Sequence, residues 1–154
     1  MKILLIEDDE EKAEILADFI KVEFPRLELD LARSFGSGLR SLIKGALIYK
    51  LLLLDMSMPI YDVTPNEPGG GKPESFAGSE ILAQMRLRGI DIPTVVVTMF
   101  DKFGDEPTQI SLEELKRDLE KYSPTFRGIT YYNSAQEGWR ASLKKLVDET
   151  LGQK

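Results

Sequence analysis

The sequence predicts an α/β protein whose core is a doubly wound, mostly parallel sheet of five strands. Apolar or alternating runs of strand length occur five times along the 154 residues, and a segment with apolar side chains at helical spacing follows each run. Strands and helices that alternate in this way are joined by right-handed crossovers, which place helices on both faces of the sheet. We expect residues 1–154 to form a single domain, because a chain of this length can bury one hydrophobic core.

Apolar spacing and helix-ending signals define the first two strand–helix units. Residues 2–7, KILLIE, form a continuous apolar run that ends in acids, which is typical of a strand covered on both faces. Residues 10–24 carry apolar side chains at helical spacing and end before a proline. Residues 27–32 alternate as a strand does, and Ser34 then provides an N-cap for a second helix that ends near Gly45.

The third and fourth units contain the most apolar strands of the chain. Residues 49–55, YKLLLLD, predict a third strand that carries an aspartate at its end. A helix is expected over residues 79–88, and the β-branched run at residues 92–98 predicts the fourth strand.

The remaining elements lie in the C-terminal third. Residues 111–122 predict a helix that opens with a capping box between Ser111 and Glu114. Residues 128–132 predict a short fifth strand, and residues 136–150 predict a final amphipathic helix.

Composition excludes several classes of function. The net charge of −6 argues against general nucleic-acid binding, which needs a basic face. The chain has no cysteine and no histidine, so thiolate zinc sites and histidine-based triads are excluded. The apolar start is too short for a signal peptide, and no stretch approaches the roughly 20 apolar residues of a membrane span. We expect a cytoplasmic protein that does not associate with membranes.

Polar side chains end three of the predicted strands. Glu7 and Asp8 end the first, Asp55 ends the third and Thr98 ends the fourth. Ligands of doubly wound sheets bind outside the carboxyl ends of the strands, so these residues meet at one edge if the strands are neighbours. Three carboxylates there would repel one another and raise each other's pKa. A hard divalent cation resolves this conflict, and the ligand types suit Mg²⁺.

Each of these residues also has an ordinary structural explanation. Glu7, Asp8 and Asp9 could be a solvated strand end, or they could be charges at a helix N-terminus that the helix dipole favours. Asp55 could cap a turn before Pro59. Thr98 could be one more β-branched strand residue. Their occurrence together at successive strand ends favours the functional interpretation.

Four segments together resemble the receiver domain of two-component response regulators. They are ILLIEDDE (3–10), LLLLDMSMP (51–59), GSEILAQMR (78–86) and IPTVVVT (92–98). The resemblance covers residues 1–100 well and the last third in outline. It implies the flavodoxin-like strand order 2-1-3-4-5.

The resemblance also assigns functions to single residues. It implies that Asp55 is the phosphoacceptor, that Asp8 and Asp55 bind Mg²⁺, and that Glu7 is their outer partner. The backbone carbonyl of Ser57 corresponds to a third protein ligand. Thr98 corresponds to the hydroxyl that hydrogen-bonds the phosphoryl group and shifts on activation.

A stand-alone receiver is therefore expected to take a phosphoryl group from a histidine kinase or a histidine phosphotransfer protein. It would signal through a protein partner or act as a phosphate sink, with no enzymatic activity beyond its own phosphorylation and hydrolysis. A pseudo-receiver that binds proteins without being phosphorylated is the alternative. A phosphohydrolase of haloacid-dehalogenase type is disfavoured, because that chemistry needs an aspartate where Ser57 stands.

Two departures from the family pattern concern this site. The family places a lysine after the fifth strand, but the candidates there are Tyr131, Tyr132, Asn133 and Ser134. Lys102 is the tentative substitute as a phosphate contact, and Lys72 is another. Met99 stands where the family prefers a small residue, and its bulk is expected to hinder the water that hydrolyses an acyl phosphate. One of the two tyrosines could also be the family's aromatic switch residue.

Two insertions lengthen the chain relative to the family. Residues 60–77 extend the connection after the third strand, and residues 100–126 enlarge the segment around the fourth helix. The glycine run before Lys72 is not a phosphate-binding loop, because Pro73 follows where that loop has Ser or Thr.

Overall fold

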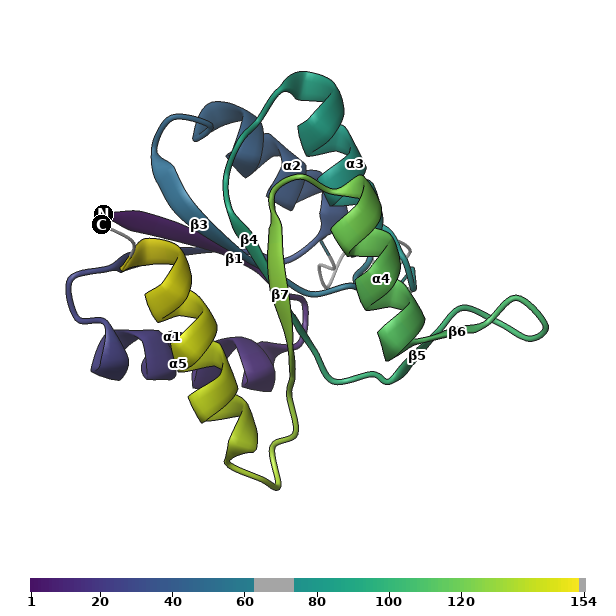
Figure 1. Cartoon of the computed structure of the whole chain (residues 1–154). Helices are drawn as coiled ribbons and strands as arrows, with labels where there is room; N and C mark the ends of the chain where they lie inside the picture. Colours follow the sequence, from purple (N-terminus) through teal and green to yellow (C-terminus); the bar gives the residue numbers. More distant parts are fainter. Residues whose placement is uncertain (63–73, 153–154) are drawn as a thin grey trace.

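The computed structural model describes residues 1–62 and 74–152, and its main feature is a five-stranded parallel sheet (Figure 1). The strands of this sheet are β1 (Lys2–Ile6), β2 (Glu28–Ala32), β3 (Tyr49–Leu54), β4 (Thr94–Thr98) and β7 (Phe126–Tyr131). Their order is β2-β1-β3-β4-β7, and every neighbouring pair is parallel. Because β7 is the fifth strand of this sheet along the chain, the predicted order 2-1-3-4-5 is confirmed.

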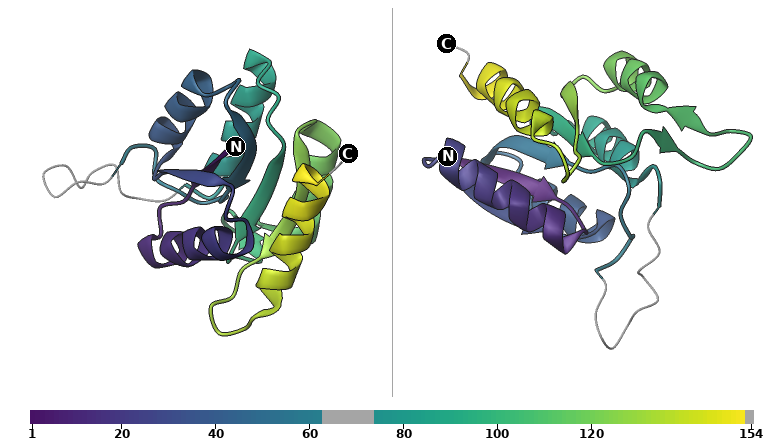
Figure 2. Two further views of the ribbon diagram at one scale, coloured as in Figure 1. Left: turned by 90° about the vertical axis from the view of Figure 1, so that its left-hand side faces the viewer. Right: turned by 90° about the horizontal axis from the view of Figure 1, so that it is seen from below.

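Helices cover both faces of the sheet (Figure 1, Figure 2). They are α1 (Glu10–Glu23), α2 (Phe35–Lys44), α3 (Ala77–Arg88), α4 (Leu112–Tyr122) and α5 (Gly138–Leu151). Helices α1 and α5 pack on one face, and α2, α3 and α4 pack on the other. Each face has its own apolar cluster, and alternate leucines of β1 and β3 contribute to both. This double coverage explains why these strands are continuous apolar runs.

Three helices begin with the caps that their sequences provide. The predicted N-cap Ser34 and the predicted capping box at Ser111 are both confirmed, since each side chain accepts from a backbone N–H three residues later. At Ser34 the structure shows a full capping box, which was not predicted from the sequence. The Asp9 side chain caps α1 by accepting from the Lys12 amide. Trp139 on α5 is buried in the cluster between α1, α5 and the sheet.

A short hairpin, β5 (Lys102–Phe103) with β6 (Ile110–Ser111), was not predicted. It lies in the segment 100–126, which the sequence marked only as enlarged. Strands of two residues show no periodicity, so the pattern could not reveal them. Phe103 anchors the hairpin, since its side chain is buried and its ring centroid lies 6.4 Å from that of Phe76.

Four elements begin two residues away from their predicted starts, namely α3, β4, β7 and α5. Helix α3 begins at Ala77 rather than residue 79, and Gly78, a weak helix former, hides that start. Strand β7 begins at Phe126 rather than residue 128, because pairing with Thr94 on β4 extends it. Most of the insertion 60–77, including Lys72, lies outside the described residues. Across the described ranges, no helix is both long and apolar enough to span a membrane.

Candidate functional site

The carboxyl ends of β1, β3 and β4 meet at one edge of the sheet. Ile6 on β1 pairs with Leu54 on β3, and Leu54 pairs in turn with Val96 on β4. The residues that follow are therefore neighbours, and the Asp55 amide donates to the Ile6 carbonyl over 3.1 Å. The strand order thus brings Glu7, Asp8 and Asp55 together from segments nearly fifty residues apart.

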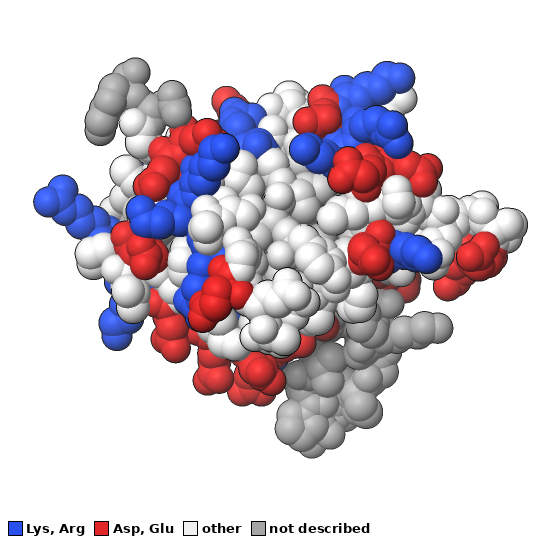
Figure 3. All heavy atoms as spheres, turned by 60° about the horizontal axis from the view of Figure 1, so that its bottom comes forward, with Lys and Arg blue, Asp and Glu red and all other residues white. Residues whose placement is uncertain are grey.

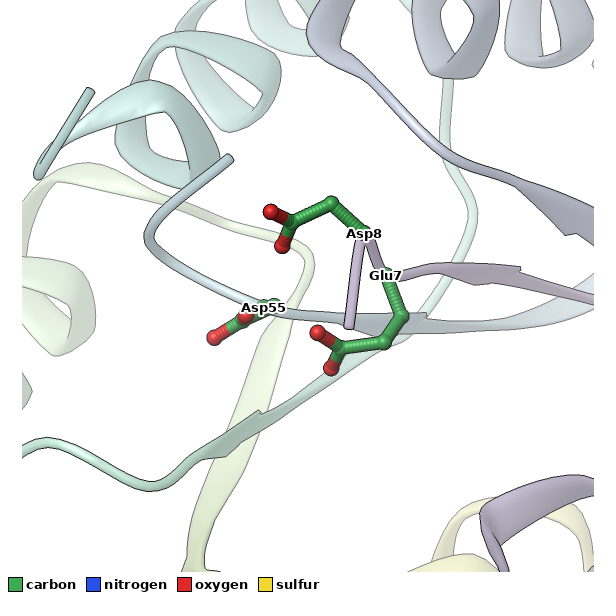
Figure 4. Close-up of side chains that lie close together, drawn as sticks. All are labelled: Glu7, Asp8 and Asp55. Carbon is green, nitrogen blue, oxygen red and sulfur yellow. The ribbon is translucent and has the colours of Figure 1, made fainter. Parts of the chain in front are cut away.

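The three carboxylates face a common space (Figure 4). One oxygen from each of Glu7, Asp8 and Asp55 lies within 4.8 Å of the other two. Glu7 and Asp55 are almost fully buried, and Asp8 is half-buried. Charged side chains that are visible on the lower face of the molecule lie mostly around a broad uncharged area (Figure 3). Three carboxylate oxygens at the spacing found for Glu7, Asp8 and Asp55 fit a hard divalent cation.

Asp55 is held by the backbone around it. Its Oδ1 accepts from the Met56 amide over 2.8 Å, which fixes the rotation of the carboxylate. Helix α3 packs directly on this turn, where the Gly78 amide donates to the Met56 carbonyl over 2.9 Å. A Cβ at Gly78 would stand 2.4 Å from the Asp55 carbonyl oxygen, so only glycine permits this close approach.

A lysine that the sequence did not single out lies among the acids. Lys12, in the first turn of α1, has a side chain that is 1% exposed. Its Nζ donates to the Val97 carbonyl over 2.8 Å. The same Nζ lies 2.7 Å from Glu7 Oε1 and 3.5 Å from Asp55 Oδ1. Among the described residues, Lys12 is the cation that forms ion pairs with these two carboxylates.

Burial and crowding raise the pKa of two of the acids. Burial and then the charge of Asp55 together raise the pKa of Glu7 to about 9, although Lys12 lowers it in part. Burial also raises the pKa of Asp8, again with a contribution from Asp55. Glu7 Oε1 is close to Lys12 Nζ, but the angle does not meet hydrogen-bond geometry. One ammonium is therefore insufficient for three carboxylates, and a proton or a metal cation would complete the balance.

Thr98 lies at the end of β4 and is fully buried. Its hydroxyl accepts from the Phe100 amide over 3.2 Å, and its carbonyl accepts from the Tyr132 amide over 2.7 Å. Thr98 therefore joins the ends of β4 and β7 next to the acids. Ser57 lies two residues after Asp55 and is partly exposed.

The residues considered as replacements for the missing lysine lie in different places. Lys102 is exposed and begins β5, where it pairs with Ser111 in the hairpin. Lys72 is outside the described residues. Tyr131 is 45% exposed, whereas Tyr132 is buried and its ring centroid lies 5.7 Å from Lys12 Nζ. The segment after β7 thus contributes the aromatic ring of Tyr132, whereas the ammonium near the acids is that of Lys12 on α1.

A signal for Lys12 was present in the sequence. Lys12, Leu16 and Phe19 follow the spacing i, i+4, i+7, so they share the buried face of α1. Lysine is rarely buried unless it is paired with an opposite charge or a hydrogen-bond acceptor. A lysine on the apolar face of a helix, close after the acids that end a strand, therefore indicates a buried acceptor for its ammonium. The sequence cannot identify that partner, because Val97 is 85 residues away along the chain.

The chain is similar in sequence to two known proteins over nearly its whole length. No protein-family model matches the chain. The Detocs response regulatory protein DtcB of Enterobacter cloacae is 29% identical over 150 residues, which is 97% of this chain and 99% of that protein. The uncharacterized protein y4jR of Sinorhizobium fredii is 31% identical over 147 residues, covering 94% of this chain and 95% of the relative.

Solved structures of similar fold include receiver domains. A response regulator receiver domain protein from Clostridium thermocellum has a TM-score of 0.65 at 14% identity, covering 98% of this chain and 94% of that one. The response regulator TrrA from Thermotoga maritima, solved in complex with Mg²⁺-BeF, has a TM-score of 0.59 at 18% identity. The match covers 94% of this chain and 97% of TrrA. At these identities the structures establish the fold.

Proposed function

Since the chain belongs to the family of response-regulator receiver domains, we propose that it accepts a phosphoryl group on Asp55. The donor is a histidine kinase or a histidine phosphotransfer protein. The observation that carries the proposal is the position of Asp55, a buried carboxylate at the end of β3 that shares its space with Glu7 and Asp8. A partner protein would read the phosphorylated form, or the domain would store the phosphoryl group.

Mg²⁺ is the proposed cofactor. Asp8 and Asp55 would hold it directly, with Glu7 as their buried partner and the Ser57 carbonyl as a further ligand. The donor set supports this assignment, because all three side chains offer carboxylate oxygens within 4.8 Å of one another. A bound divalent cation would neutralise charge on the oxygens of the transferring phosphoryl group.

The proposed reaction is an in-line phosphoryl transfer. An Asp55 carboxylate oxygen forms a bond to phosphorus while the bond from phosphorus to the donor imidazole nitrogen breaks, and the imidazole leaves with the bonding electron pair. Because the Met56 amide donates to Oδ1, we assign the nucleophile to Oδ2. The product is an acyl phosphate, which water later hydrolyses.

Labelling with a small phosphodonor tests this function. Incubation with Mg²⁺ and radiolabelled acetyl phosphate is expected to label the wild-type protein, and Asp55→Asn is expected to abolish the label. Asp9→Asn is the matched control, because Asp9 caps α1 through a side-chain oxygen that asparagine retains. Label that survives Asp55→Asn would contradict the assignment.

One observation favours the alternative of a protein-binding pseudo-receiver. Lys12 already pairs with Glu7 and Asp55, so its ammonium together with a proton on one carboxyl could take over the charge balance that Mg²⁺ would provide. A Mg²⁺ titration separates the two functions. A receiver is expected to gain thermal stability at millimolar Mg²⁺ by preferential binding to the folded state, whereas a pseudo-receiver is not.

A further inference from the structure

We propose that Lys12 binds the phosphoryl oxygens on Asp55, so that α1 supplies the cation which the family takes from the segment after the last strand. This inference rests on the proposed function of Asp55. It assigns a phosphoryl-binding residue to an element that the family pattern does not use for this purpose.

The position of Lys12 supports this assignment. Its ammonium is buried at the ends of β1, β3 and β4, held by the carbonyl of Val97, the residue directly before Thr98. A lysine is almost never fully buried unless it is paired, because its charge loses water. One of its partners belongs to the proposed phosphoacceptor, since Lys12 Nζ lies 3.5 Å from Asp55 Oδ1.

The donors of Lys12 are only partly used. An ammonium has three N–H groups, and the Val97 carbonyl accepts one of them in good geometry. The contact to Glu7 Oε1 is short but poorly angled, and 3.5 Å to Asp55 is too long for a strong hydrogen bond. A phosphoryl group on Asp55 would bring further oxygens to this ammonium. The N–H groups of Lys12 that lack a well-aligned acceptor would then donate charge-assisted hydrogen bonds to the phosphoryl oxygens.

Tyr132 occupies the region after β7 where the family has its lysine. It is one of the four residues among which the family pattern expects a lysine, and its buried ring lies against Lys12 and Trp139. Its amide is bonded to the Thr98 carbonyl, so the end of β7 remains beside the site. An aromatic residue at this position and a lysine on α1 together keep one cation at Asp55.

A simpler role for Lys12 is neutralisation of Glu7 within a buried ion pair. In that case its removal would reduce stability but leave the affinity for a phosphoryl analogue unchanged. The two roles therefore differ in a measurable quantity.

Binding of beryllofluoride, which stands in for the phosphoryl group, provides the test. Fluorescence of Trp139, the single tryptophan, reports binding in the presence of saturating Mg²⁺. We expect Lys12→Met to weaken beryllofluoride affinity about 10- to 100-fold, the range for losing a hydrogen bond to a charged group. Lys21→Met, at an exposed position of the same helix, is the matched control and is expected to bind as the wild type does.

The double variant Lys12→Met with Tyr132→Lys returns a lysine to the end of β7. We expect it to recover affinity, because the cation rather than the helix position is what the phosphoryl group needs. Affinity of folded Lys12→Met within about twofold of Lys21→Met would overturn the proposal. A loss that the double variant does not recover would also count against it, as would a comparable loss in Lys102→Met.

The outcomes separate this inference from the proposed function. Failure of the wild-type protein to bind beryllofluoride with Mg²⁺ contradicts the function itself, whereas equal binding by wild type and Lys12→Met contradicts only the assignment of Lys12. If Lys12→Met does not fold, ¹⁵N NMR of the wild-type protein replaces it. The buried ammonium of Lys12 should exchange slowly and shift when beryllofluoride is added, and an unchanged resonance would refute the proposal.

Discussion

The buried carboxyl of Glu7 makes stability depend on pH in a direction that can be worked out. Its pKa in the folded protein is about 9, raised from an ordinary value of 4.5, mainly by burial. Between these values the folded protein keeps a proton that the unfolded chain releases. The stabilisation is therefore fully present below about pH 4.5 and is lost as the pH rises through about 9.

The size of the effect follows from one proton. The free energy of unfolding in the absence of metal should fall by at most about 1.4 kcal/mol for each pH unit, hence by up to about 3 kcal/mol from pH 6 to pH 8. Asp8 contributes in the same direction, because its pKa is also raised. Glu7→Gln keeps the shape of the protonated side chain, so this variant should lose most of the pH dependence.

Urea unfolding followed by Trp139 fluorescence at pH 6, 7 and 8 in EDTA measures the slope. The wild-type midpoint should fall with rising pH, and the Glu7→Gln midpoint should change much less. Asp9→Asn, which leaves the buried carboxyls in place, serves as the control. Parallel pH profiles for wild type and Glu7→Gln would refute the reasoning.

Three further predictions concern metal binding, packing and hydrolysis. Asp8→Asn should markedly reduce the rise in melting temperature that Mg²⁺ produces, and an unchanged rise in calorimetry would remove Asp8 from the metal site. Gly78→Ala should destabilise the protein by about 1–3 kcal/mol in urea unfolding, because the new Cβ would meet the Asp55 carbonyl at 2.4 Å; a neutral change would show that α3 shifts freely. Met99→Ala should shorten the acyl-phosphate half-life by admitting water, whereas an equal half-life would show that Met99 only packs against the Trp139 cluster.

The sheet was predictable because its strands carry their own signals. The leucine runs of β1 and β3 are buried on both faces, and the serine caps of α2 and α4 mark helix starts in the sequence itself. The acidic cluster followed from strand order, since the chain places acids directly after neighbouring strands.

Contacts between residues far apart in the sequence could not be predicted. Lys12 resembles any lysine of an amphipathic helix until its partner on β4 is known. Lys102 lies four residues past Thr98 and begins the hairpin of β5 and β6, where its side chain is exposed, and its contact with a phosphoryl group stays a prediction. The buried ring of Tyr132 beside Lys12 is likewise a tertiary contact that no local pattern contains.

Direct identification of the phosphorylated residue tests the central claim. After incubation with phosphoramidate and Mg²⁺, borohydride reduction converts an aspartyl phosphate to homoserine, which peptide mass spectrometry can locate. We predict homoserine at position 55, dependent on Mg²⁺ and absent without the phosphodonor. Homoserine at Asp8 or Asp9 instead, or an unmodified Asp55 in folded protein at millimolar Mg²⁺, would contradict the account.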